Sequence, residues 1–114
     1  MLTSGDVADV DFGLPRGREA GFKRPAIVVT AQRLLDRSPS VVQVVPLTTT
    51  IRGFESEVGV EASSDNGLDH PSAAQCAQIR SVSADQVSEV KGNVGTVVLT
   101  QVRQAIAETL GVGP

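Results

Sequence analysis

Residues 23–30 read KRPAIVVT, and residues 41–50 read VVQVVPLTTT. Each stretch contains an apolar run that is rich in the β-branched residues that favour strands. Arg24 precedes the first run, and Thr48 follows the second. If the two runs are neighbouring antiparallel strands, the beginning of one lies beside the end of the other. The sequence therefore predicts that Arg24 and Thr48 meet at one edge of a sheet.

The remaining strands are predicted from apolar runs and from alternation of apolar and polar residues, with Gly-, Pro- and Ser-rich turns between them. Pro25 is expected to open its strand, because proline is tolerated at the first residue of a strand or on an edge. The number of short strands predicts a small, mostly antiparallel barrel. Strands are expected at residues 5–12, 25–29, 41–47, 55–61 and 72–82.

Helical segments are predicted at three places. One or two turns are expected at residues 30–37, with Thr30 as the cap, and residues 83–86 have the spacing of a capping box. The final helix begins near Thr96, where apolar residues recur at the spacing of one helical face. This amphipathic face consists of Leu99, Val102, Ile106 and Leu110.

Length and composition predict a single domain covering residues 1–114. Apolar residues make up 40% of the chain, which is enough to fill one small core. The chain has no Trp or Tyr and three Phe, so few aromatic platforms are available for stacking bases. The net charge is −3, but residues 1–54 carry seven Lys/Arg against five Asp/Glu. This local basic excess, around Arg16, Arg18, Lys23 and Arg24, is compatible with binding a short nucleic-acid segment or with an ordinary solvated loop.

Cys76 is the only cysteine and His70 the only histidine. No disulfide within the chain and no metal site with ligand spacing is therefore expected, and no cofactor motif is present. We expect Cys76 to be an inert core residue, whereas His70 lies beside a proline turn and is a weak candidate for an acid. The sequence has no signal peptide and no apolar stretch of membrane-spanning length, which predicts a cytoplasmic protein.

Arg24 and Thr48 are the first candidates for catalysis. A guanidinium group matches phosphate oxygens with a planar donor fork, and its permanent charge suits it to stabilising a phosphorane rather than to acting as a base. The Thr48 hydroxyl can donate to a phosphate oxygen, and Thr49 or Thr50 is expected to share its face. Gln78 and Arg80, two residues apart on a predicted strand, are expected to point to one side.

In order and spacing, these motifs resemble the MazF/PemK family of toxin endoribonucleases over nearly the whole chain. The resemblance is carried by GDV at residues 5–7, GRE at 17–19, RPAIV at 24–28, VPLTT at 45–49 and QIRSV at 78–82. It implies an SH3-like barrel of the CcdB/MazF type that acts as a homodimer. It also implies a toxin of a type II toxin–antitoxin system, with an antitoxin partner whose acidic, flexible tail competes for the RNA groove.

The resemblance further implies metal-independent cleavage of single-stranded RNA. The 2′-OH would attack the neighbouring phosphate, leaving a 2′,3′-cyclic phosphate (or a 3′-phosphate) and a 5′-OH. Arg24 and Thr48 fall on the catalytic pair of the family. The residues expected to bind RNA are Arg16, Arg18, Glu19, Lys23, Thr49, Gln78 and Arg80.

Two other functions fit the same barrel. A gyrase-poisoning toxin of the CcdB type would bind protein through its terminal helix and would need no Arg/Thr pair. An RNA-binding barrel without catalysis would use the same arginine for affinity alone. Replacement of Arg24 separates these hypotheses, since it abolishes activity only where the arginine is catalytic.

Overall fold

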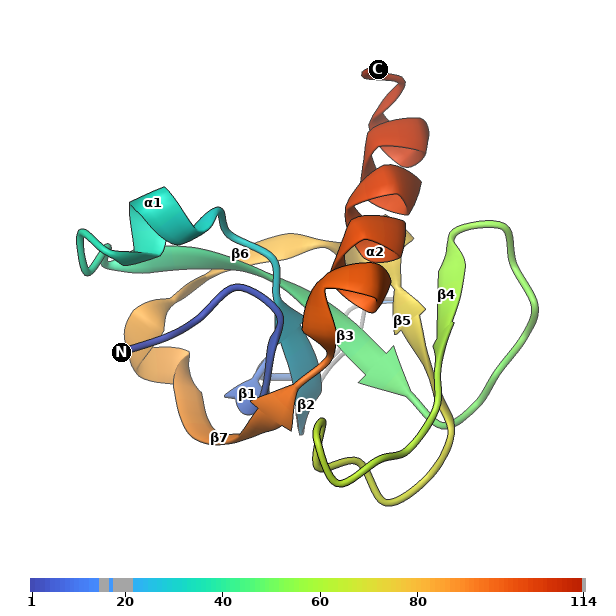
Figure 1. Cartoon of the computed structure of the whole chain (residues 1–114), viewed down its shortest axis with the longest axis horizontal. Helices are drawn as coiled ribbons and strands as arrows, with labels where there is room; N and C mark the ends of the chain where they lie inside the picture. Colours follow the sequence, from blue (N-terminus) through green and yellow to red (C-terminus); the bar gives the residue numbers. More distant parts are fainter. Residues whose placement is uncertain (15–16, 18–21, 114) are drawn as a thin grey trace.

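The computed structural model describes residues 1–14, 17 and 22–113. Within them, seven strands form one curled antiparallel sheet, in the order β4-β5-β3-β2-β1-β7 with β6 beside β3 (Figure 1). The sheet is barrel-like but not closed, because β4 and β7 end the series. The elements are β1 (Asp6–Asp11), β2 (Lys23–Val28), α1 (Gln32–Leu35), β3 (Val41–Thr48), β4 (Glu57–Val60), β5 (Ser72–Gln75), η1 (Cys76–Gln78), β6 (Arg80–Ser83), η2 (Ala84–Gln86), β7 (Val87–Asn93) and α2 (Gly95–Leu110).

The central strands are buried on both faces, which explains why their apolar runs are continuous rather than alternating. On β2, Ile27 packs in a cluster with Val102 of helix α2, whereas its neighbours Ala26 and Val28 pack in a second cluster on the opposite face. Successive residues of β3 divide between the two clusters in the same way. The predicted fold class, an antiparallel barrel with a C-terminal helix, is confirmed.

β3 is flanked on one side by two different strands, and this corrects the prediction of one strand at residues 72–82. Leu47 pairs with Ala74 of β5; in that register Val44 would face residue 77, but it faces Arg80 of β6. The three-residue turn η1 takes up the difference. Gln78 lies in this turn and Arg80 in the next strand, so the two do not share one side of a single strand as predicted.

Three local predictions were wrong. The N-cap of α1 is Ala31, while the Thr30 hydroxyl donates to Gln43 Oε1 at 2.9 Å. β2 begins at Lys23, so Pro25 lies inside the strand rather than at its start. Proline has no N–H to donate, and it is tolerated here because β2 pairs with β3 only from Ala26 onward. Only a strand remnant near Gly92 was expected where the seven-residue strand β7 lies. The predicted capping box at residues 83–86, in contrast, is present and begins the turn η2.

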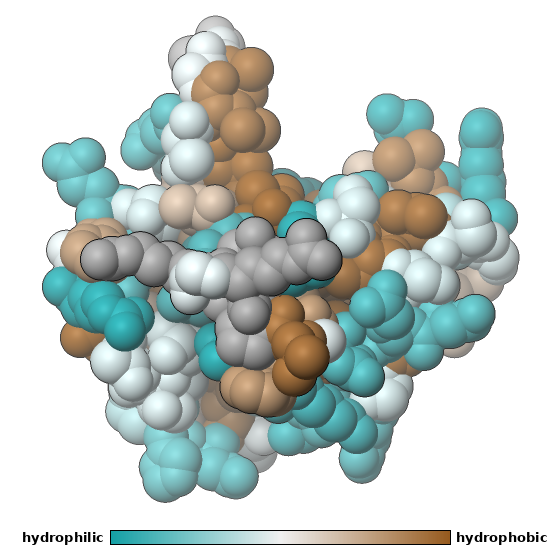
Figure 2. All heavy atoms as spheres, turned by 180° about the vertical axis from the view of Figure 1, so that it is seen from behind, coloured by the Kyte–Doolittle hydropathy of each residue, from teal (hydrophilic) through white to brown (hydrophobic). Residues whose placement is uncertain are grey.

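Helix α2 packs through its first half and then projects beyond the sheet (Figure 1). Leu99 and Val102 are buried as predicted and Ile106 is partly buried, but Leu110 is 62% exposed. Figure 2 shows apolar surface along this projecting helix. Across the described ranges of the chain, no helix combines the length and the hydropathy that spanning a bilayer requires.

Cys76 is fully buried at the start of η1, in the cluster that α2 covers. Burial raises the pKa of its thiol to about 11. At pH 8 only about one thiol in a thousand is then ionised, so we expect the native protein not to react with a thiol reagent such as DTNB on a timescale of minutes. The reaction should accelerate as the pH approaches 11 and should be immediate in guanidinium chloride. Rapid labelling of the native protein at pH 8 would contradict this.

Candidate active site

Arg24 and Thr48 lie on the same face of the sheet. Side chains alternate along a strand, so Arg24 shares a face with Ala26 of β2, and Thr48 shares one with Val44 of β3. Ala26 and Val44 belong to the same buried cluster. The antiparallel register pairs Ala26 with Pro46, and its continuation by two residues sets Arg24 opposite Thr48. The predicted meeting of the two side chains therefore follows from register and face together.

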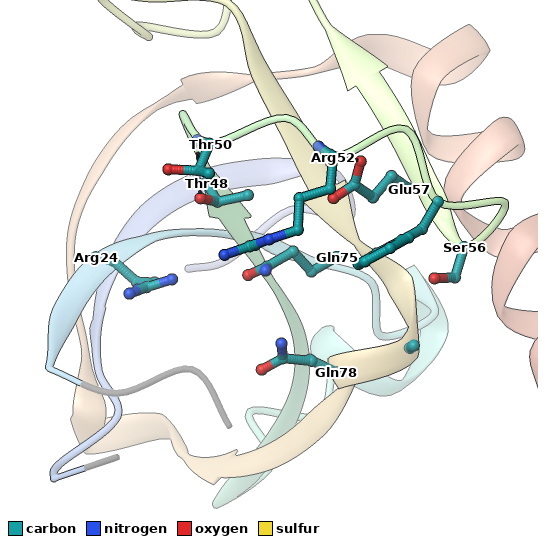
Figure 3. A pocket seen from close by; sticks show the side chains of 10 residues that line it. Arg24, Thr48, Thr50, Arg52, Ser56, Glu57, Gln75 and Gln78 are labelled. Carbon is teal, nitrogen blue, oxygen red and sulfur yellow. Dashed lines mark hydrogen bonds between the residues drawn. The ribbon is translucent and has the colours of Figure 1, made fainter. Parts of the chain in front are cut away.

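Both residues line an open pocket of about 460 Å³ (Figure 3). Strands β2, β3, β4 and β5, the β3–β4 connection and the turn η1 all contribute to its wall. The lining residues are Arg24, Thr48, Thr50, Arg52, Phe54, Ser56, Glu57, Gln75, Ala77 and Gln78. Two are arginines and one is a carboxylate, so the pocket carries a net positive charge on a chain of net charge −3.

Arg24 is half-buried, and its Nε is buried without a hydrogen-bond partner among the described residues. Figure 3 shows its guanidinium reaching into the pocket from β2. A buried donor without an acceptor is unfavourable unless a ligand supplies one. The ligand best matched to a planar cationic donor is an oxyanion such as a phosphate.

The Thr48 hydroxyl is oriented by the backbone that follows it. Its Oγ1 accepts the N–H of Thr50 at 3.1 Å, which is the short turn that threonine forms at strand ends. With one lone pair engaged in this way, the hydroxyl keeps its proton available to donate. Thr50 itself lines the pocket beside Thr48.

Opposite the threonines, the pocket wall is formed by amides and one carboxylate. Gln75 Oε1 is buried and has no partner in the described part of the chain, so it offers an acceptor to a bound molecule. Gln78 lines the pocket from η1. Glu57 pairs with Gln75 across the β4–β5 hairpin, and its Oε1 accepts the backbone N–H groups of Arg52 and Gly53 at 3.1 and 2.8 Å.

The other residues predicted to bind RNA are dispersed. Arg80 stacks on the Phe12 ring at 5.3 Å and borders an adjoining hollow that it shares with Gln78. Lys23 and Thr49 are exposed and are not part of the pocket wall formed by the described residues. Three further predictions, Arg16, Arg18 and Glu19, lie outside the described residues.

Sequence reasoning missed Arg52, Glu57 and Gln75. A signal for Arg52 was present, since Thr48, Thr50 and Arg52 are spaced by two and fall on one side if the chain stays extended after β3. No comparable signal marks Glu57 and Gln75, which reach the pocket through the register of the β4–β5 hairpin. His70 is exposed and does not line this pocket.

Comparison with known proteins gives a family match over residues 3–110, to the PemK-like, MazF-like toxin of type II toxin–antitoxin systems. Endoribonuclease MazF9 of Mycobacterium tuberculosis is 32% identical over an alignment of 113 residues that covers 93% of this chain and 93% of that one. Endoribonuclease MazF3 of the same species is 32% identical over 88 residues, covering 77% of this chain and 79% of that one.

Solved structures share the fold. MazF of Deinococcus radiodurans superposes with a TM-score of 0.82 at 23% identity, covering 97% of each chain. A mycobacterial endoribonuclease solved with its cognate antitoxin superposes with a TM-score of 0.77 at 22% identity, covering 100% of this chain and 99% of that one. At these identities, the structural likeness bears on the fold alone.

Proposed function

Because the chain belongs to the family of PemK-like, MazF-like toxins of type II toxin–antitoxin systems, we propose that it acts as an endoribonuclease through Arg24 and Thr48. The observation that carries this proposal is the convergence of the two side chains in one pocket, where the buried Nε of Arg24 has no partner among the described residues. The toxin and endoribonuclease assignment follows from the family and its curated relatives.

The proposed reaction is attack of a ribose 2′-OH on the adjacent phosphate of single-stranded RNA. The P–O5′ bond breaks as the new P–O2′ bond forms, leaving a 2′,3′-cyclic phosphate, which can open to a 3′-phosphate, and a 5′-OH. DNA lacks this nucleophile and is not a substrate. Arg24 stabilises the additional negative charge on the phosphorane, and the Thr48 hydroxyl donates to a phosphate oxygen. We propose that the reaction needs no metal, because arginines supply the positive charge of the pocket.

The test is cleavage of a long single-stranded RNA by the purified protein in EDTA, with both new ends mapped. We expect discrete cuts that leave a cyclic phosphate and a 5′-OH, and we expect a 2′-O-methyl group at the cut position to block cleavage. Cuts that leave a 5′-phosphate, or cuts in the blocked strand, would reject attack by the 2′-OH.

Thr48 offers a prediction of its own. Thr48→Val keeps the shape of the side chain but removes the hydroxyl, so the single-turnover rate on a short RNA should fall by roughly a hundredfold. Thr48→Ser keeps both the donor and the acceptor for the Thr50 N–H, and should stay within about tenfold of the wild-type rate. A Thr48→Val rate close to that of the wild type would contradict a catalytic role for this hydroxyl.

We also propose that the protein forms a homodimer in the cytoplasm and binds a cognate antitoxin. A complex of this kind exists for the mycobacterial endoribonuclease described above. An acidic, flexible tail would be attracted to a pocket that carries two arginines. Light scattering of the purified protein tests the dimer, and RNA cleavage in the presence of a synthetic acidic antitoxin peptide tests competition for the pocket.

A further inference from the structure

A second arginine faces the pocket from the segment that joins β3 and β4. Arg52 is an exposed residue whose side chain lines the pocket, and Figure 3 shows its guanidinium extending toward the side from which Arg24 enters. Two like charges directed into one pocket repel each other, and a bound anion relieves that repulsion. The arrangement therefore favours occupation of the pocket by an anion.

The backbone at Arg52 is held by Glu57, the first residue of β4. Glu57 Oε1 accepts the N–H of Arg52 at 3.1 Å and the N–H of Gly53 at 2.8 Å. Gly53 has a φ of +74°, a conformation that glycine adopts without strain. Because Glu57 is paired with Gln75 in the β4–β5 hairpin, these two hydrogen bonds anchor the segment to the sheet.

The other end of the segment is held as well, since the Thr50 N–H donates to Thr48 Oγ1 at 3.1 Å. The backbone on both sides of Ile51 is thus fixed by side chains of the pocket. Binding a ligand through Arg52 costs less conformational entropy because the backbone that carries this side chain is already held in place.

One carboxylate in the pocket cannot neutralise two guanidinium groups, so a net positive charge remains. Glu57 is the one acidic residue among the described lining residues, and one of its oxygens is occupied by two backbone N–H groups. Within the described part of the chain, Arg24 has no hydrogen-bond partner at its Nε. A backbone carrying one negative charge per nucleotide can place one phosphate at each arginine.

We propose that Arg52 is a second phosphate-binding residue, positioned by Glu57, that holds the RNA backbone opposite Arg24; this inference rests on the proposed function. Arg24, with its buried Nε, acts at the phosphate being cleaved. Arg52 lies at the exposed side of the pocket and contacts a neighbouring phosphate in the ground state. Arg52 therefore contributes mainly to RNA affinity, and Glu57 is a positioning residue.

The experiment measures binding of a short single-stranded RNA that carries a 2′-deoxy group at the mapped cleavage position and cannot be cut. Arg52→Ala should raise the Kd roughly tenfold, as expected for the loss of one charge-assisted hydrogen bond. The slope of log Kd against log salt should fall by about 0.7, the contribution of one phosphate on a single strand. Arg52→Lys keeps the charge and should keep the slope.

Two further variants test the role of Glu57. Glu57→Ala and Glu57→Gln both remove a negative charge that repels RNA, so the difference between them isolates the acceptor that holds the segment. Glu57→Gln keeps an acceptor oxygen and should bind more tightly than Glu57→Ala. The matched control is Arg37→Ala: this exposed arginine precedes β3, at the opposite end of the strand from Thr48, and its loss should leave Kd and slope unchanged.

The inference is overturned if Arg52→Ala keeps the wild-type Kd and salt slope, or if Arg37→Ala changes both as strongly. It is also overturned if Arg52→Ala abolishes the cleavage rate at saturating RNA while binding is unchanged. Failure of the proposed function looks different: Arg24→Ala would still cut RNA, while the effect of Arg52→Ala on binding would persist.

Discussion

Replacing Arg24 by alanine is expected to lower the rate of RNA cleavage at saturating substrate by roughly a thousandfold. The guanidinium is the group that can stabilise charge developing on the phosphorane, and removing such a donor from a preorganised site typically costs two to three orders of magnitude. Arg24→Lys keeps a point charge but loses the planar fork, so it should recover a minor part of the activity. Single-turnover kinetics on a short RNA containing one mapped site measures both variants.

Stability provides the control for this loss. Arg24 Nε is buried without a partner among the described residues, so the arginine does not stabilise the unliganded fold through that group. Arg24→Met keeps an aliphatic stem of similar length and should unfold at a temperature equal to or above that of the wild type. A variant that is inactive but equally stable separates a catalytic role from a structural one.

The same variants discriminate among the alternative functions. A gyrase-poisoning protein would lose little toxicity with Arg24→Ala, and an RNA-binding barrel would show weaker binding with no cleavage in the wild type either. If Arg24→Ala retains cleavage within tenfold of the wild type, Arg24 is not the catalytic cation and the assignment of the pocket is wrong.

The fold could be predicted as far as the chain obeys local rules. The continuous runs around Ile27 and Val44 indicated strands, and their burial on both faces accounts for the absence of alternation. β7 was missed because bulges interrupt its pairing with β1: Ala8 and Val10 face Val90 and Val87, so β7 carries an extra residue and its apolar positions do not alternate.

The site was predictable where it depends on strand ends and not where it depends on long-range register. Arg24 and Thr48 are brought together by the pairing of two runs that are recognisable in the sequence. Gln75 and Glu57 enter the pocket because β5 stops at the turn η1 and pairs with β4. β5 ends at this turn because β5 and β6 pair with β3 in different registers, and no local sequence pattern predicts a change of register.

The largest expected effect on stability is that of Gly92→Ala in β7. The backbone of the turn at residues 63–67 lies directly on this glycine: a Cβ at Gly92 would stand 2.3 Å from the carbonyl oxygen of Asp65 and 2.6 Å from the carbonyl carbon of Asn66. The Asn93 N–H donates to the same Asp65 oxygen at 2.8 Å, which holds the turn in place.

The turn cannot easily move away, because the buried Asn66 organises it. Asn66 Nδ2 donates to the Glu61 carbonyl at 2.7 Å, and its Oδ1 accepts the N–H groups of Ser63 and Leu68 at 3.1 and 3.0 Å. Relief of the clash must therefore break hydrogen bonds or shift β7 away from β1. We expect a loss of about 3 kcal/mol or more in the free energy of unfolding, seen as a fall of roughly 10 °C or more in Tm.

Gly59→Ala is the matched control, since it adds the same methyl group to a strand glycine with no atom within 4 Å of the new Cβ. Its free energy of unfolding should stay within about 0.5 kcal/mol of the wild type or rise slightly, because alanine restricts the unfolded chain. Thermal and urea unfolding of the two variants measures the difference. Equal stability of Gly92→Ala and Gly59→Ala would mean that the turn at residues 63–67 does not rest on β7 as described.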